Sequence, residues 1–228
     1  QLIWYPEEDA GGFCMTYFPG KPLQSSYPLG AVLRIIKNLL NCLEGAHAHN
    51  FFHGDIRPEN ILILANGQIR VIDWGIGAIV NKGPGRYLGS SAIGFQEFMA
   101  PEQIATGILS AQSDLFAVAL VLYELLSGEC VFAGSLDRYE VISLRSKGAV
   151  LGESFTNIAG QFSDLRNHFI TKVDKNNSPL STIEACADLF IWLTAYNPAD
   201  RPTTTQARQA IERIEALSNI SFGTPVSI

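Results

Sequence analysis

Several features that would place this chain in a specialised class are missing from its sequence. Its four cysteines, at positions 14, 42, 130 and 186, form no CxxC pair, which argues against a zinc ribbon and for reduced thiols in the cytoplasm. The longest apolar run, residues 115–123, is far shorter than the roughly 20 residues that cross a bilayer, so we expect no membrane segment. Lysine and arginine total 16 against 22 acidic residues without a long basic run, so we expect no nucleic-acid partner.

What is present suits one sizeable folded unit. Hydrophobic residues make up 47% of 228 residues, which is enough for one core, and the sequence has no internal repeats. The first residues, QLIWYPEEDAGG, hold no basic stretch followed by an apolar one, so we expect no signal peptide. They read like the middle of a strand, and we expect the sequence to be a piece of a longer protein.

Apolar spacing predicts a mainly helical chain with a small β-hairpin. Two short strands are expected at 2–5 and 13–18, followed by a linker rich in Pro, Gly and Ser. The apolar positions from Val32 to Leu43 recur with the spacing of one helix face. Helices are expected at about 32–49, 114–126, 183–195 and 204–217.

One loop, HGDIRPEN at residues 53–60, carries an unusual density of polar side chains. It leads into ILILANGQIRVI, in which two strand-like runs flank Asn66-Gly67, a strong hairpin signal. The sequence DWG, which begins at Asp73, follows the second run. Because a hairpin folds its two ends together, Asn60 and Asp73 should lie close in space.

These side chains suit phosphoryl transfer. The amide oxygen of Asn60 and the carboxylate of Asp73 are hard ligands of the kind that Mg²⁺ prefers. Asp55 would stand apart and accept a proton from an attacking hydroxyl, while Arg57 would bring positive charge. A crowded polar turn without chemistry is the alternative, and the D-x-G sequence directly after the Asn-Gly hairpin argues against it.

The motifs HGDIRPEN, IDWG, FMAPE, SDLFAVALVLYELLSG and NPADRP, in this order, resemble the large lobe of a eukaryotic-type protein kinase. The resemblance runs from about residue 1 to about residue 217. It implies a kinase-like large lobe over residues 19–228, with residues 1–18 as the remnant of small-lobe strands and the hinge. The expected fold is therefore mainly α with a small β-hairpin, and the small lobe is largely absent from this chain.

The resemblance implies a role for each residue of the polar loop. Asp55 would be the catalytic base, and Asn60 and Asp73 would hold Mg²⁺. Arg57 stands near the transferred phosphate, where the family usually has Lys, and offers a planar fork in place of a point charge. The implied activity is ATP-dependent transfer of a phosphoryl group to a Ser or Thr hydroxyl of a protein substrate.

The resemblance also implies an ATP site. Leu62 would form the floor under the adenine. MTYF would be the hinge, with Met15 as the gatekeeper and the backbone of Thr16 to Phe18 facing the base. The glycine-rich loop, the strand Lys and the helix Glu that a kinase needs are not in this sequence, so we expect them in the intact protein.

Outside the loop, the resemblance implies structural contacts. Glu102 would pair with Arg201 inside the large lobe, and Asp114 would brace the polar loop through backbone N–H groups. A zinc site is not expected from the histidines, because His47 and His49 face different sides of a helix.

Gly54 stands where the family usually has an Arg directly before the catalytic Asp. That Arg usually binds a phosphate on the activation loop. We therefore expect a non-RD kinase whose activity does not depend on phosphorylation of Tyr87, Ser90 or Ser91. The sequence RPEN favours Ser/Thr acceptors, whereas Phe95 stands where a Thr is usual and weakens that choice.

Two other functions stay open. HGD and IDW also resemble the aminoglycoside and choline phosphotransferases, although FMAPE, SDLFAVALVLYELLSG and NPADRP look like protein-kinase features. The second alternative is a pseudokinase, a binding scaffold that has lost turnover, and the retained Asp55, Asn60 and Asp73 argue against it.

Overall fold

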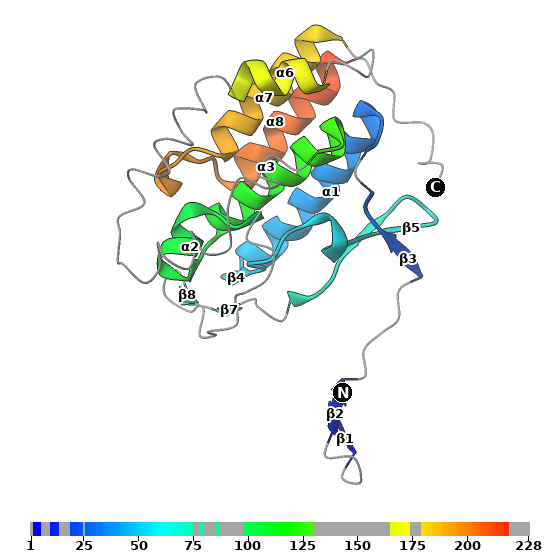
Figure 1. Cartoon of the computed structure of the whole chain (residues 1–228), viewed down its shortest axis with the longest axis vertical. Coiled ribbons are helices and arrows are strands. Elements are labelled where there is room, and N and C mark those ends of the chain that lie inside the picture. The colour runs from blue at the N-terminus through cyan, green and yellow to red at the C-terminus, as the bar shows by residue number, and fades with distance from the viewer. Residues whose placement is uncertain are drawn as a thin grey trace.

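The computed structural model describes residues 2–5, 10–13, 19–24, 26–74, 78–79, 85–86, 98–129, 165–173 and 179–218. This part of the chain is mostly helical, and its long helices α1, α3, α7 and α8 lie side by side (Figure 1). The helices are α1 (Leu29–His47), α2 (Pro101–Thr106), α3 (Ala111–Ser127), α6 (Leu165–Val173), α7 (Leu180–Leu193) and α8 (Thr204–Leu217), with short 3₁₀ turns η1 (Pro58–Asn60) and η5 (Pro198–Asp200). Across the described ranges, no helix is long and apolar enough to span a membrane.

The central helix α3 is buried on nearly all sides. Every residue from Ser113 to Tyr123 is buried, because apolar residues occupy all faces of the helix. Ser110 caps the N-terminus by accepting a hydrogen bond from the backbone N–H of Ser113 (3.1 Å), and Gly128 ends the helix with a φ of 78°. The helix therefore starts at a fixed point, beside which the functional residues lie.

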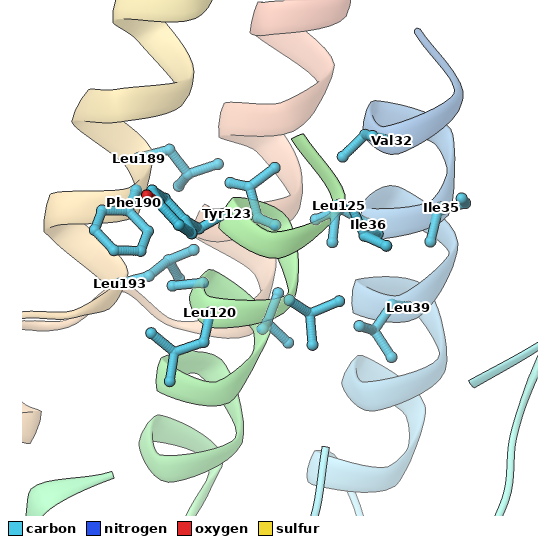
Figure 2. Packing of buried hydrophobic residues seen from close by; sticks show 14 of the residues in the cluster. Val32, Ile35, Ile36, Leu39, Leu120, Tyr123, Leu125, Leu189, Phe190 and Leu193 are labelled. Carbon is cyan, nitrogen blue, oxygen red and sulfur yellow. The ribbon is translucent and has the colours of Figure 1, made fainter. Parts of the chain in front are cut away.

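The hydrophobic core fills the space between the long helices. Figure 2 shows side chains of α1, α3 and α7 pointing into this space. Tyr123 packs against Phe190 with ring centroids 5.8 Å apart, and against Phe169 at 5.7 Å. All three rings are almost fully excluded from water, which is the burial that holds the helices together.

The predicted helices are confirmed, with consistent shifts at their N-termini. The predictions at 32–49, 114–126 and 183–195 correspond to α1, α3 and α7, each of which begins three residues earlier, while α8 matches its predicted range. In α3 the first turn is polar and capped by Ser110, whereas α1 begins with Leu29 and α7 with Leu180, each directly after a proline.

The predicted hairpin is also confirmed. Strand β5 (Ile61–Leu64) pairs antiparallel with β6 (Ile69–Val71), with Ile61 opposite Val71. The chain reverses through residues 65–67, and Gly67 adopts a φ of 77° while its N–H donates to Leu64 O (2.8 Å). The reversal is thus a longer turn closed by a left-handed glycine, not a two-residue turn at 66–67.

A strand was missed in the predicted linker. Strand β3 (Gly20–Pro22) pairs with β5 and completes a three-stranded sheet in the order β3-β5-β6. A Cβ on Gly20 would lie 2.9 Å from Leu64 Cδ2 and 3.0 Å from Leu62 Cβ. Glycine therefore belongs to the strand because of this close approach, and reading it as a linker residue was wrong.

The N-terminal strands lie partly outside their predicted positions. Strand β1 (Leu2–Tyr5) matches the prediction and pairs with β2 (Ala10–Phe13), with Leu2 opposite Phe13. The second strand was predicted at 13–18, whereas β2 already begins at Ala10, because its pairing uses backbone groups of a glycine-containing stretch that has no apolar pattern. Positions 14–18 of the predicted strand lie outside the described residues. The remaining strands form two short pairs, β4 (Phe51–Phe52) with β7 (Ala78–Ile79) and β8 (Gly85–Arg86) with β9 (Ile108–Leu109).

Candidate active site

The polar loop, residues 53–60, is anchored to the start of α3 by one buried carboxylate. Asp114 Oδ2 accepts the backbone N–H of His53 (2.9 Å), and Asp114 Oδ1 accepts that of Gly54 (2.8 Å). Asp114 is 1% exposed, so both bonds are shielded from water. The predicted bracing of the loop by Asp114 is confirmed.

The side chain of His53 links the polar loop to the end of the hairpin. Its Nε2 lies 2.9 Å from Ile72 O, and its Nδ1 accepts the backbone N–H of Asp55 (3.2 Å). A carbonyl can only accept, so the geometry assigns the proton of the neutral ring to Nε2. The ring is fully buried and packs against Trp74 with centroids 4.6 Å apart. His53 is thus a packing and bridging residue.

Asp55 and Asn60 are in direct contact. Asn60 Nδ2 donates to Asp55 Oδ2 (2.8 Å) and to Asp55 O (2.9 Å), while Asn60 itself is 5% exposed. The turn η1 brings them together, since the N–H of Asn60 donates to Arg57 O (3.0 Å). The amide fixes one carboxylate oxygen of Asp55 and leaves the amide oxygen of Asn60 as the atom that could meet a cation.

Arg57 places its charge beside the same carboxylate. Its Nε lies 3.6 Å from Asp55 Oδ2 and 3.8 Å from Glu59 Oε2. Its side chain is 14% exposed, as is that of Asp55, whereas that of Glu59 is 57% exposed. The positive charge therefore sits at a partly screened position next to Asp55, where Coulomb interactions are stronger than in bulk water.

The backbone of the hairpin places Asp73 near Asn60. The N–H of Ile72 donates to Asn60 O (2.9 Å), which puts the residue before Asp73 directly against Asn60. Asp73 has a φ of 60°, an uncommon left-handed conformation for a residue other than glycine, and its side chain is exposed. The predicted approach of the two ends of the hairpin is confirmed for the backbone.

The donor set suits a hard cation more than a transition metal. Asn60 offers an amide oxygen and Asp73 an accessible carboxylate, and Mg²⁺ commonly takes one or two such groups plus water and phosphate oxygens. Within the described ranges, no three His, Cys, Asp or Glu residues are grouped to hold a metal ion. The two oxygen donors therefore fit Mg²⁺ shared with a phosphate-bearing ligand.

Of the residues predicted to bind ATP, only Leu62 lies within the described ranges. Leu62 lies on β5, in the sheet next to the polar loop, and is half-buried. Met15, Thr16 and Phe18, the predicted hinge residues, lie outside the described residues.

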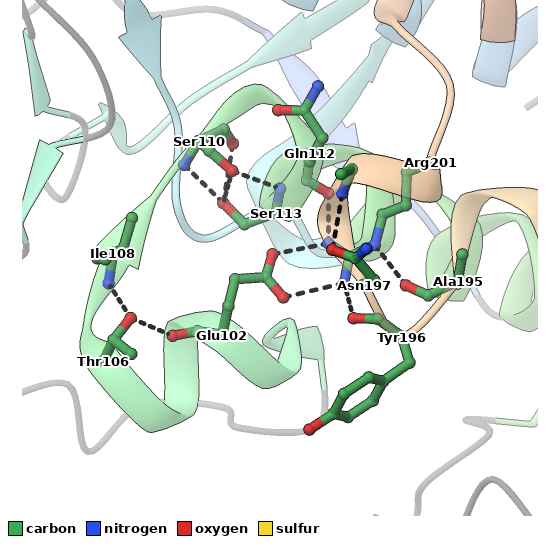
Figure 3. Close-up of polar contacts among 11 residues, drawn as sticks. Glu102, Thr106, Ile108, Ser110, Gln112, Ser113, Ala195, Tyr196, Asn197 and Arg201 are labelled. Atoms are coloured by element: carbon green, nitrogen blue, oxygen red, sulfur yellow. Dashed lines mark hydrogen bonds and ion pairs between the residues drawn. The ribbon is translucent and has the colours of Figure 1, made fainter. Parts of the chain in front are cut away.

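A largely buried ion pair between Glu102 and Arg201 joins the elements next to the site. Nη1 and Nη2 of Arg201 donate to the two carboxylate oxygens of Glu102, at 2.6 Å and 2.9 Å, as predicted (Figure 3). Arg201 also donates to Ala195 O (2.8 Å) and to Gln112 O (2.9 Å). Its side chain is fully buried, so α2 is fixed to the start of α3 and to the segment between α7 and α8.

Sequence reasoning missed two residues that touch this region. Gln103 Nε2 donates to Gly54 O (2.6 Å), and His47 Nε2 lies 2.8 Å from Asp114 Oδ2. Neither contact has a local signal, because each joins segments that are far apart in the sequence. The position of Gln103 directly after FMAPE was the available hint.

Comparison with known proteins adds an independent finding. Residues 7–211 match the family described as "Protein kinase domain". "Serine/threonine-protein kinase pkn3" of Myxococcus xanthus is 33% identical over 135 residues, which cover 54% of this chain and 25% of that protein. "Serine/threonine-protein kinase PrkC" of Bacillus subtilis is 32% identical over 134 residues, covering 56% of this chain and 20% of that protein.

A third relative matches more of the chain. "Striated muscle preferentially expressed protein kinase" of Danio rerio is 30% identical over 187 residues, which cover 80% of this chain and 6% of that protein. The chain thus spans a quarter or less of the length of each of these three relatives.

Proposed function

Because this chain belongs to the protein kinase domain family, we propose that the protein transfers a phosphoryl group from ATP to a Ser or Thr hydroxyl of a protein substrate. Family membership supports the reaction type, and the bacterial relatives named as serine/threonine-protein kinases support the acceptor. The observation that carries the proposal is the contact between Asp55 and Asn60, with the residue before Asp73 bonded to Asn60 through its backbone.

Asp55 is the proposed catalytic base. The amide of Asn60 occupies Asp55 Oδ2, so Oδ1 is the oxygen that would take the proton of the attacking hydroxyl. The nearby guanidinium of Arg57 would offset negative charge on the transferred group, with a planar fork in place of the usual ammonium. In this reaction the protein mainly positions groups and stabilises charge.

Mg²⁺ is the proposed metal, held by the amide oxygen of Asn60 and the carboxylate of Asp73. When bound, it would neutralise phosphate charge. The bond from Ile72 N–H to Asn60 O keeps the two ligands at adjoining backbone positions. The exposure of Asp73 leaves its carboxylate open to solvent, from which the ion and its phosphate partner would arrive.

ATP is the proposed phosphoryl donor, with Leu62 under the adenine and Met15, Thr16 and Phe18 as the hinge. The half-buried position of Leu62 beside the polar loop supports the first assignment. Residues 1–18 are proposed as the end of the small lobe, which agrees with the antiparallel pair β1–β2. A cytoplasmic location is likewise proposed.

Activity independent of activation-loop phosphorylation is proposed from Gly54. The structure of the polar loop supports this, because Gly54 is held by its backbone and offers no side chain for a phosphate. Replacing Ser90 and Ser91 with Ala should leave turnover within about twofold of wild type. A large loss would contradict the proposal.

The test is transfer of radiolabelled phosphate from ATP by the full-length protein, with generic protein acceptors and aminoglycosides assayed side by side. We expect label on Ser or Thr of protein acceptors. Asp55→Ala should lower the rate by about 10²–10⁴-fold, the usual worth of a general base. The matched control is Asp188→Ala, which removes an exposed carboxylate on α7 that pairs with the surface residue Arg166 (2.6 Å).

Each other outcome favours a different function. Label on aminoglycosides but not on proteins would indicate a small-molecule phosphotransferase. Nucleotide binding without transfer to any acceptor would indicate a pseudokinase scaffold. Equal rates for wild type and Asp55→Ala would remove Asp55 from the reaction.

A further inference from the structure

Both backbone groups of Gly54 are held by buried side chains. Its N–H donates to Asp114 Oδ1 (2.8 Å), and its carbonyl oxygen accepts from Gln103 Nε2 (2.6 Å). Gly54 is itself buried and has a φ of 79°, in the left-handed region. A glycine in this region has more backbone freedom than other residues, so the two side chains restrain a segment that would otherwise be loose.

The contact with Gln103 acts on the peptide plane that leads into Asp55. The oxygen of this plane belongs to Gly54 and is held by Gln103, and its N–H belongs to Asp55 and is held by His53 Nδ1 (3.2 Å). The plane is thus held at both edges by side chains. Because peptide groups are rigid, fixing the plane fixes the direction in which the Cα of Asp55 leaves it.

Gln103 is placed by the ion pair that follows FMAPE. It lies on α2 directly after Glu102, whose carboxylate is clamped by Arg201. Gln103 is 6% exposed, so water does not compete for its bond to Gly54. Neighbouring residues of α2 therefore contact different segments: Glu102 contacts Arg201, and Gln103 contacts the polar loop.

From these contacts we infer that Gln103 is a positioning residue for the reaction: its amide sets the peptide plane that orients Asp55. The inference rests on the proposed function for its effect on turnover, and on geometry alone for its effect on the loop. A glutamine that only filled space in the core would affect stability without acting specifically on the amide of Asp55.

The first test measures hydrogen exchange, which does not depend on any activity. Gln103→Leu removes the donor and keeps an apolar side chain of similar size; Gln209→Leu, at an exposed position of α8, is the matched control. We expect the Asp55 amide to exchange at least tenfold faster in Gln103→Leu, with the amide of Leu120 in the core unchanged. Unchanged Asp55 exchange, or equal acceleration at both amides, would overturn the inference. If Gln103→Leu does not fold, Gln103→Met is read by the same criteria.

The second test measures phosphoryl transfer. Gln103→Leu should lower kcat by about 10- to 100-fold with the KM for ATP within twofold, because Gln103 bonds to the polar loop and is not among the residues proposed to bind ATP. A change confined to KM, or no change, would overturn the inference. If wild type transfers no phosphate, the proposed function fails while the exchange experiment still decides the role of Gln103 in the loop.

A charge variant adds a pH signature. In Gln103→Glu, the ionised carboxylate cannot donate to Gly54 O, whereas the protonated acid can, and burial favours the neutral form. Its kcat, divided by that of wild type at each pH, should therefore rise as the pH falls. Asp55 and Asp114 line the same space as residue 103, and both proteins carry them. A ratio that is flat with pH would contradict the proposed hydrogen bond.

Discussion

The polar loop and the seam between α1 and α8 both hold charged side chains, but they do so differently. At the loop, the buried carboxylate of Asp114, from the start of α3, accepts two backbone N–H groups of the loop and meets the His47 ring. In the seam, Lys37 pairs with Glu215 (2.8 Å) and Arg208 with Glu44 (3.0 Å), with partly exposed cations. Water can replace a lost partner in the seam but not in the loop. Contacts of similar length should therefore differ greatly in their contribution to stability.

Asp114 should show the largest effect. Asp114→Ala leaves the backbone N–H groups of His53 and Gly54 without their acceptor in a site that excludes water. We expect a loss of about 3–5 kcal/mol in the free energy of unfolding. Urea unfolding followed by circular dichroism measures it, with Asp188→Ala as the exposed control. A loss no greater than that of the control would end the distinction between the two regions.

Arg201 should come next. Arg201→Met keeps a long apolar side chain but leaves the Glu102 carboxylate without its partner and removes one hydrogen bond from each of the carbonyls of Ala195 and Gln112. The expected loss is about 2–4 kcal/mol, below the full cost of a fully buried pair because Glu102 is 18% exposed. Arg208→Met in the seam is the matched control and should change the unfolding midpoint little. Equal shifts for the two variants would contradict the comparison.

Two glycines should respond in opposite directions to the same substitution. Gly54→Ala puts a Cβ on a left-handed residue and should destabilise by about 1–2 kcal/mol. Gly45→Ala, inside α1, should stabilise by about 0.5–1 kcal/mol, because the new methyl group would meet no neighbouring side chain or other segment within 4 Å. Thermal unfolding of the two variants in parallel gives the signs. The same sign for both would show that backbone conformation does not decide the outcome.

The smallest effect is expected in the seam itself. The hydrogen bond from Thr205 lowers the pKa of Glu44, with a further contribution from Arg208. Thr205→Val should raise this pKa toward its ordinary value, as measured by an NMR pH titration. Since a lowered carboxyl pKa stabilises the fold only above the unfolded-state pKa, the stability difference should be present at neutral pH and vanish as the pH falls through the folded-state pKa. A Glu44 pKa that does not move would show that the bond is not formed in solution.

Features that depend on local contacts could be predicted from the sequence, and those that depend on a distant partner could not. The polar loop and the hairpin were predictable because a short reversal at residues 65–67 brings the residue before Asp73 to Asn60, and Asn60 contacts Asp55 within the same loop. Strand β3 was not predictable, since Gly20 lies in a strand only because it fits against Leu62 and Leu64. Local patterns report local geometry, and this strand depends on a distant partner.

The contact of Gln103 with Gly54 is a second case. A single glutamine on α2 has no spacing or periodicity that points to a carbonyl in another loop. By contrast, the pairing of Glu102 with Arg201 was accessible through the resemblance to kinases, and the structure confirms it. Tertiary contacts of isolated polar residues are therefore the part of the site that required coordinates.

The proposed chemistry depends above all on Asn60 and Asp73 holding one divalent ion beside Asp55. This arrangement can be tested by NMR of the full-length protein with a non-hydrolysable ATP analogue, titrated with Mn²⁺ as a paramagnetic substitute for Mg²⁺. We expect the side-chain amide signals of Asn60 and the signals of Asp73 to broaden together at the same low Mn²⁺ concentration. Broadening of only one of them, or broadening elsewhere while both stay sharp, would contradict a shared ion.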